Sequence, residues 1–176
     1  MSAPQPGQRA GRVFWIMAWV AGLALLTLAL GRWEEARHNP NQVPESLRGS
    51  DFIELRLASN PQGHYLLDGR IDGQAVTFLL DTGATDVAIP AALAERLGLS
   101  PGAAVEVLTA NGRAMGRRTR LRHLQLGEIG LDNVAALIVP GMDGDEVLLG
   151  MSALRQLEFT QRDGTLVLRQ TPMRTR

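Results

Sequence analysis

The chain has 176 residues, a formal net charge of zero and no cysteine. The absence of cysteine excludes disulfides, thiol nucleophiles and thiolate metal sites. All 18 basic residues are arginine, which excludes lysine-dependent P-loop and Schiff-base chemistry. A balanced charge gives no overall field to attract nucleic acid, so no nucleic-acid partner is expected.

The N-terminal part of the chain is set apart by its composition. A short tail, residues 1–12, precedes 19 residues without a charge, 13–31. As a helix these would span about 28 Å, close to the hydrocarbon thickness of a bilayer. The pattern predicts a retained transmembrane anchor rather than a cleaved signal peptide, because the apolar stretch exceeds a usual signal-peptide core. Residues 32–50 are polar and contain Pro40 and Pro44, which predicts a tether.

The remaining residues, 51–176, show short apolar runs separated by turn signals. Residues 52–57, 74–80, 134–139, 146–149 and 166–169 are expected as strands. The expected turns are Asp68–Gly69, Asp72–Gly73, Asn111–Gly112 and Asp163–Gly164. Short helices are expected over 91–97, which Gly98 would end, and over 151–157. The pattern predicts an all-β domain, a small closed barrel with one or two short helices.

One carboxylate is placed where it could do chemistry. Asp81-Thr82-Gly83 directly follows the apolar run Phe78–Leu80, so a buried strand would deliver Asp81 to the edge of the core. Glycine at the third position permits the backbone to approach the carboxylate closely. An aspartate held in this way suits general acid/base work, although the tripeptide alone could be a simple turn. A second segment, Leu148-Leu149-Gly150, follows some 65 residues later, before the predicted short helix.

Together these segments resemble the retropepsin-like aspartic proteases, and more narrowly their membrane-anchored bacterial branch. The resemblance implies that Asp81, Thr82 and Gly83 form the catalytic loop. It also implies that Leu148, Leu149 and Gly150 pass behind that loop in a ψ shape, and that Asn111 and Gly112 belong to a flap over the substrate. An extended polypeptide is the implied substrate. No metal or other cofactor is expected, because the three histidines lack the spacing of zinc ligands.

Hydrolysis by this route needs two facing carboxylates, and the chain contains one Asp-Thr-Gly. A homodimer with the site on its two-fold axis is therefore expected. As in the family, the terminal strand around Leu166–Leu168 is the candidate to pair with its mate. The expected location is the bacterial inner membrane, with a single span and a periplasmic catalytic domain that acts on envelope proteins.

Two further features bear on function. Ala84 stands where pepsin-like enzymes usually have Ser or Thr, and the missing hydroxyl donor predicts an activity optimum nearer neutral than that of pepsin. Ser152 lies in a Gly-x-Ser sequence, but no histidine follows it, so a Ser–Asp–His order is not available and an N-cap is the better interpretation. The alternative function is a catalytically silent module of the same fold that binds peptides by strand addition.

Overall fold

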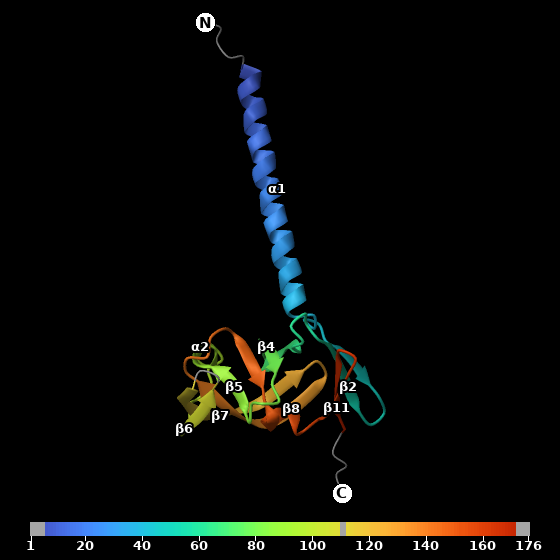
Figure 1. The fold of residues 1–176 in the computed structure, drawn as a ribbon, viewed down its shortest axis with the longest axis vertical. Helices are drawn as coiled ribbons and strands as arrows, with labels where there is room; N and C mark the ends of the chain where they lie inside the picture. The colour runs from blue at the N-terminus through green and yellow to red at the C-terminus, as the bar shows by residue number, and fades with distance from the viewer. Residues whose placement is uncertain (1–5, 110–111, 172–176) are drawn as a thin grey trace. The chain divides into compact units, whose positions relative to one another are not determined.

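A computed structural model describes residues 6–109 and 112–171 of the chain. The chain divides into two units, one ending at Arg37 and one beginning at His38. The first unit is a single long helix, α1 (Pro6–His38), which Figure 1 shows in blue. An 18-residue window within Gly11–His38 has a mean hydropathy of 2.3, and none of that window is buried. The length and composition of α1 are those of a membrane anchor or a signal sequence.

Residues 32–50, predicted as a polar tether, form regular secondary structure at both ends. The first part continues α1 to His38, and the last part forms β1 (Glu45–Arg48), which pairs with β2 (Ile53–Ala58). Between them, Asn39 and Asn41 are only 5% and 6% exposed. The domain therefore begins at His38 rather than at residue 51.

Hydrogen bonds of the asparagine side chains explain this difference. The Asn41 amide donates to the carbonyl oxygens of Ala58 and Leu66 at 3.0 and 2.6 Å, and its Oδ1 accepts from the Ala58 amide at 2.8 Å. Asn39 Nδ2 donates to Asp68 Oδ1 at 2.8 Å. Polar side chains can be buried when their hydrogen bonds are satisfied, so a polar composition did not mean a solvated segment here.

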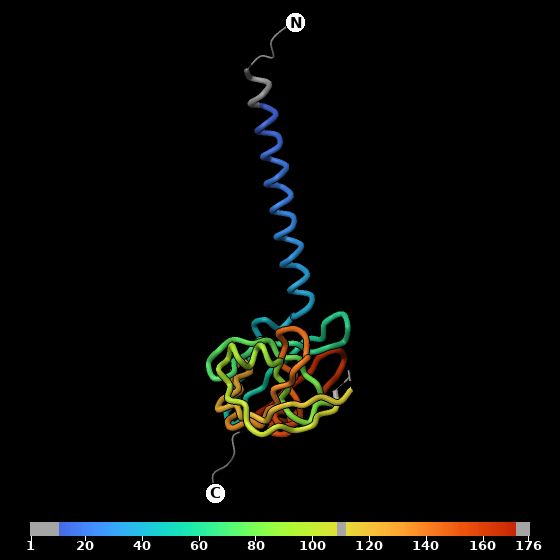
Figure 2. Tube along the Cα trace, turned by 90° about the vertical axis from the view of Figure 1, so that its left-hand side faces the viewer, coloured from blue at the N-terminus to red at the C-terminus, as the bar shows by residue number. Residues whose placement is uncertain are grey.

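Most of the domain is a seven-stranded sheet in the order β3-β4-β9-β5-β8-β7-β6. An additional pairing of β3 with β7 closes part of it into a barrel. Strand β9 pairs parallel with β4 and antiparallel with β5, so a late segment of the chain passes between two early ones (Figures 1 and 2). Its strands are β3 (Leu66–Ile71), β4 (Gln74–Leu80), β5 (Val87–Pro90), β6 (Ala104–Thr109), β7 (Gly112–Leu126), β8 (Ile129–Val139) and β9 (Glu146–Leu149).

The other strands form a four-stranded sheet in the order β1-β2-β11-β10. Strands β10 (Glu158–Arg162) and β11 (Thr165–Gln170) form a hairpin, and Figure 1 shows β11 beside β2. The expectation that the strand around Leu166–Leu168 pairs with a second copy is corrected by this order. That strand is β11, and both of its edges are already occupied, by β2 and by β10.

The predicted turns are confirmed at two positions and wrong at a third. Asp72–Gly73 and Asp163–Gly164 both have positive φ at each residue, as a two-residue hairpin turn requires. Asp68–Gly69 lies inside β3 instead. A Cβ at Gly69 would lie 2.8 Å from the Phe78 ring, so this glycine permits close packing within the sheet rather than a turn.

The two short helices were both expected, and both are shorter than predicted. They are α2 (Ala91–Arg96) and α3 (Met151–Leu154). Gly98 has φ +67°, the left-handed conformation that ends a helix. Aliphatic side chains from both sheets and both helices form the core, which contains one phenylalanine, Phe78. The predicted fold class, an all-β domain with short helices, is confirmed.

Candidate active site

Asp81 follows the last residue of β4 and is held beside β9. Leu79 and Leu80 pair in parallel with Leu148 and Leu149. The Asp81 amide then donates to the Leu149 carbonyl at 3.3 Å. Because Leu149 is fully buried, this pairing fixes the backbone of Asp81 while its side chain stays only half-buried.

The loop after Asp81 orients the carboxylate. The Gly83 amide donates to Asp81 Oδ1 at 2.8 Å, and the Ala84 amide donates to the Asp81 carbonyl at 3.3 Å. A Cβ at Gly83 would lie 3.1 Å from Asp81 Oδ1, so a side chain here would crowd the carboxylate oxygen. Thr82 is exposed, and its hydroxyl makes no hydrogen bond to the part of the chain that the structure describes.

Gly150 packs directly against the backbone of the loop that follows Asp81, as the ψ-shaped arrangement requires. A Cβ there would collide with the Asp86 carbonyl and would lie 2.8 Å from the Ala84 carbonyl oxygen. The next two amides bind the same loop, since Met151 donates to Ala84 at 2.8 Å and Ser152 donates to Thr85 at 2.9 Å. The structure therefore brings together the two segments that the sequence singled out.

Ser152 has a structural role. Its hydroxyl donates to the Ala135 carbonyl at 2.7 Å and accepts a hydrogen bond from the Val87 amide at 3.0 Å. The hydroxyl thus ties the start of β5 to β8, and neither contact is to a histidine. The structure offers no support for a serine nucleophile.

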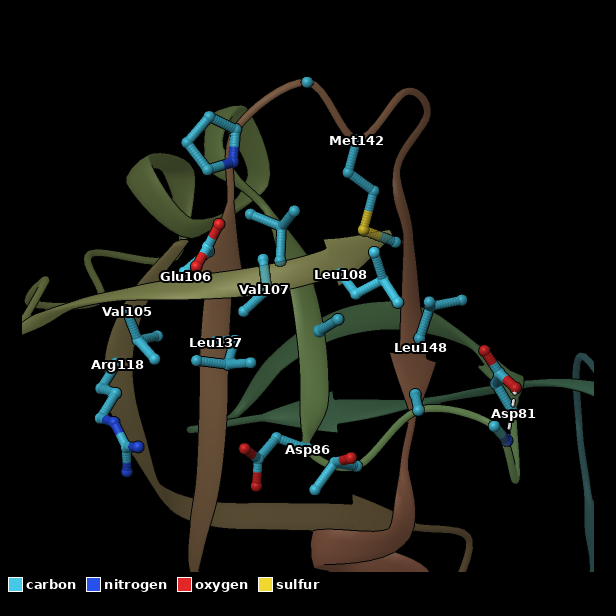
Figure 3. Close-up of a pocket in the computed structure, with 17 residues that line it drawn as sticks. Asp81, Asp86, Val105, Glu106, Val107, Leu108, Arg118, Leu137, Met142 and Leu148 are labelled. Atoms are coloured by element: carbon cyan, nitrogen blue, oxygen red, sulfur yellow. Dashed lines mark hydrogen bonds between the residues drawn. The ribbon is translucent and has the colours of Figure 1, made fainter. Parts of the chain in front are cut away.

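A cleft of about 760 Å³ extends from Asp81 (Figure 3). Sequence reasoning did not find most of its lining, because the side chains come from strands whose order could not be known. Strand β6 contributes four successive residues, Val105–Leu108. Apolar residues from β5, β8, β9 and the loop after β8 complete the walls: Ala88, Leu137, Val139, Pro140, Met142 and Leu148.

Charged side chains other than Asp81 also line the cleft. Asp86, Glu106 and Arg118 contribute to it, and Figure 3 shows Arg118 at the far end from Asp81. Glu106 is paired with Arg113 at 3.1 Å. The cleft therefore combines apolar walls with a few polar groups, as is typical of ligand sites.

The predicted flap residues are only partly described. Asn111 lies outside the described residues, and Gly112 is the first residue of β7. The strands on either side form the expected hairpin, with Val107 opposite Ala114. Since β6 of this hairpin lines the cleft, the hairpin lies where a flap would act.

Among residues 6–109 and 112–171, no group of three or more His, Asp or Glu side chains could hold a metal ion. Two of the histidines each contact a single carboxylate instead. His38 Nε2 lies 2.6 Å from Glu146 Oε1, and His123 Nδ1 lies 2.6 Å from Asp132 Oδ1.

Comparisons with known proteins agree with this geometry. Residues 67–156, which include Asp81 and Gly150, match the family model described as "gag-polyprotein putative aspartyl protease". The crystal structure of a retropepsin-like aspartic protease from Rickettsia conorii is similar, with 27% identity and a TM-score of 0.55. The similarity covers 65% of this chain and 98% of the Rickettsia chain.

A Sinorhizobium protein described only as an uncharacterized protein in the cobV 5′ region is 36% identical over 111 residues. That match covers 61% of this chain and 48% of the relative, so the chain spans about half the length of the curated protein that it matches. With the family model and the solved structure in agreement, the chain belongs to the retropepsin-like aspartyl protease family.

Proposed function

We propose that the chain is one subunit of a homodimeric aspartic endopeptidase. The observation that carries this proposal is the geometry of Asp81: its carboxylate is oriented by the Gly83 amide and lies at one end of a peptide-sized cleft. The sequence contains one Asp-Thr-Gly, and in each other Asp-Gly pair the glycine follows the aspartate directly, with no threonine between them. A second carboxylate must therefore come from a second copy.

In the proposed dimer, the two Asp81 carboxylates face each other and hold one proton between them. The ionised carboxylate accepts a proton from a water molecule as that water attacks the scissile carbonyl carbon. The protonated carboxyl donates its proton to the carbonyl oxygen, which gives a neutral tetrahedral intermediate. Transfer of a proton to the leaving nitrogen then breaks the peptide bond.

The shape and lining of the cleft favour an extended polypeptide as substrate. Its apolar walls suit apolar side chains on either side of the scissile bond, and β6 offers backbone groups along its length. The long apolar helix α1 suggests a single-pass anchor in the bacterial inner membrane. With the domain on the periplasmic side, envelope proteins would be the substrates.

The test is cleavage of an unfolded protein by the full-length chain in detergent, compared with Asp81→Asn. We expect the variant to lose at least about 1,000-fold in kcat/KM, since it removes both proton-transfer groups of the dimer. A statine-like peptide, whose hydroxyl mimics the tetrahedral intermediate, should inhibit the original chain. Equal cleavage by both chains would refute the mechanism. Peptide binding without any cleavage by either chain would favour the silent binding module.

A further inference from the structure

Strand β10 is an edge strand in the part of the chain that the structure describes. It lies at the end of the sheet order β1-β2-β11-β10, and no strand of the described residues pairs with its outer edge. All five of its residues are exposed, including Phe159, which is 43% exposed. An unpaired edge with an exposed aromatic residue is a template for another strand.

This edge lies close to the catalytic loop. Phe159 and Gln161 line a cavity of about 300 Å³ together with Thr82, Leu80 and Tyr65. Thr82 directly follows Asp81. A partner seated on β10 would therefore lie beside the position that the second Asp81 must reach.

The sequence of β10 is complementary to itself when reversed. It reads Glu158-Phe159-Thr160-Gln161-Arg162. If two copies pair antiparallel about Thr160, Glu158 of each chain lies opposite Arg162 of the other, and Phe159 lies opposite Gln161. A shift of two residues in one direction or the other places Glu158 opposite Thr160 or Gly164, and both charge pairs are lost.

The backbone pattern is compatible with this register and excludes shifts of one residue. Arg162 and Thr165 flank the two-residue turn at Asp163–Gly164, where the closing pair of a hairpin is hydrogen-bonded. Hydrogen-bonded and non-hydrogen-bonded pairs alternate along an antiparallel ladder. The amide and carbonyl groups of Phe159 and Gln161 therefore point to the free edge, and in the register about Thr160 these two residues face each other.

We propose that β10 is the strand through which two copies of this chain pair, in antiparallel register about Thr160. The proposal rests on the proposed homodimer and specifies its surface. The pairing joins two four-stranded sheets across the two-fold axis, with Glu158–Arg162 ion pairs at both ends of the junction. It also covers Phe159 and brings the Thr82 loops of the two copies together.

Disulfide trapping tests this register directly, because the chain has no cysteine of its own. Thr160→Cys would place two thiols opposite each other on the two-fold axis, within the Cα separation of about 4.4–6.8 Å that a disulfide needs. Glu158→Cys and Arg162→Cys are the matched controls. Each would lie about 14 Å from its own copy, four residues away along the strand.

We expect most of the full-length Thr160→Cys chain in detergent to be trapped as a dimer under mild oxidation, and less than about a tenth of either control. A mixture of the two control variants should cross-link, since residues 158 and 162 would be opposite each other. Equal trapping of all three single variants would overturn the proposal, because it would indicate association through α1 alone. No trapping at residue 160 would also overturn it.

Charge reversal provides a second test. Glu158→Arg alone and Arg162→Glu alone each place like charges at both ends of the junction, so the dissociation constant of the dimer should rise about tenfold. An equimolar mixture of the two variants restores both ion pairs and should restore association. Asp132→Arg, which makes the same charge change as Glu158→Arg at an exposed position of β8, is the control. Variants that associate as tightly as this control would overturn the proposal.

These measurements are independent of catalysis. If Thr160→Cys is trapped in an Asp81→Asn background while the original chain cleaves no substrate, the interface stands and the proposed protease activity fails. If Asp81→Asn abolishes cleavage while nothing is trapped at residue 160, the activity stands and the interface fails.

Discussion

Substitution of Gly150 by alanine should destabilise the loop that carries the Asp81 carboxylate. The backbone of Gly150 has φ −85° and ψ −175°, which any residue can adopt, so the cost of a side chain here is steric alone. The added Cβ would meet the carbonyl carbon of Asp86 at 2.7 Å and the carbonyl oxygen of Ala84 at 2.8 Å. Both are backbone atoms, so no side-chain rotation can relieve the contact.

The expected loss of stability follows from two contributions. Overpacking against fixed atoms costs about 1–3 kcal/mol. Separation of the strands would also weaken the hydrogen bonds that the Met151 and Ser152 amides donate to the loop, at about 1 kcal/mol each. The sum is about 3–5 kcal/mol, a large part of the stability of a domain of this size.

Urea unfolding of the full-length chain in detergent, followed by pulse proteolysis, measures this loss. All variants should carry Asp81→Asn so that no self-cleavage intervenes. Trp fluorescence is unsuitable, because all three tryptophans lie in α1. Gly130→Ala is the matched control, since a Cβ there meets only the movable side chain of His123 at 3.0 Å. A Gly150→Ala variant within about 1 kcal/mol of this control would refute the steric argument.

Two further predictions concern residues near the same loop. Ala84→Ser adds a hydroxyl donor next to Asp81, which would favour the ionised carboxylate, so the acidic limb of the pH–activity profile should move to lower pH. An unchanged or higher acidic limb would contradict this, and Ala84→Val is the control without a donor. Ser152→Ala leaves the Val87 amide and the Ala135 carbonyl without their side-chain partner and should cost about 1–3 kcal/mol of stability in urea unfolding. Its activity at low temperature should persist, and complete loss of activity in the folded variant would instead favour a serine nucleophile.

The sequence predicted the parts of the fold that depend on local chemistry. The Asp-Gly pairs at residues 72–73 and 163–164 correctly predicted turns. A two-residue hairpin turn needs positive φ at both positions, and this requirement does not depend on the rest of the fold. The apolar run before Asp81 correctly predicted strand β4. The run at 146–149 predicted strand β9 with the same bounds that the structure shows. The pairing of these two strands came only from the resemblance to the family.

The features that the sequence did not predict depend on distant partners. Asn39 and Asn41 are polar and lie in a segment with few apolar residues, yet strands β2 and β3 satisfy their hydrogen bonds and bury them. Strand β10 has no alternation of burial, since all of its residues are exposed, so periodicity could not find it. The residues of β6 and Arg118 join the cleft that extends from Asp81 only once the strand order is known.

In the proposed dimer, the geometry of Asp81 gives the edge of the four-stranded sheet a role in the chemistry. Within one chain, the carboxylate is fixed on one side by the Gly83 amide and the β9 pairing, and it remains half-buried. A single carboxylate cannot both accept a proton from water and donate one to the carbonyl oxygen in the same step. The second carboxylate of the proposed dimer would have to be held as firmly as the first. A strand pairing beside Thr82 would supply that rigidity, because it extends an existing hydrogen-bonded sheet across the two-fold axis. Loss of the β10 pairing should therefore lower activity through the position of Asp81, while each separate chain keeps its fold.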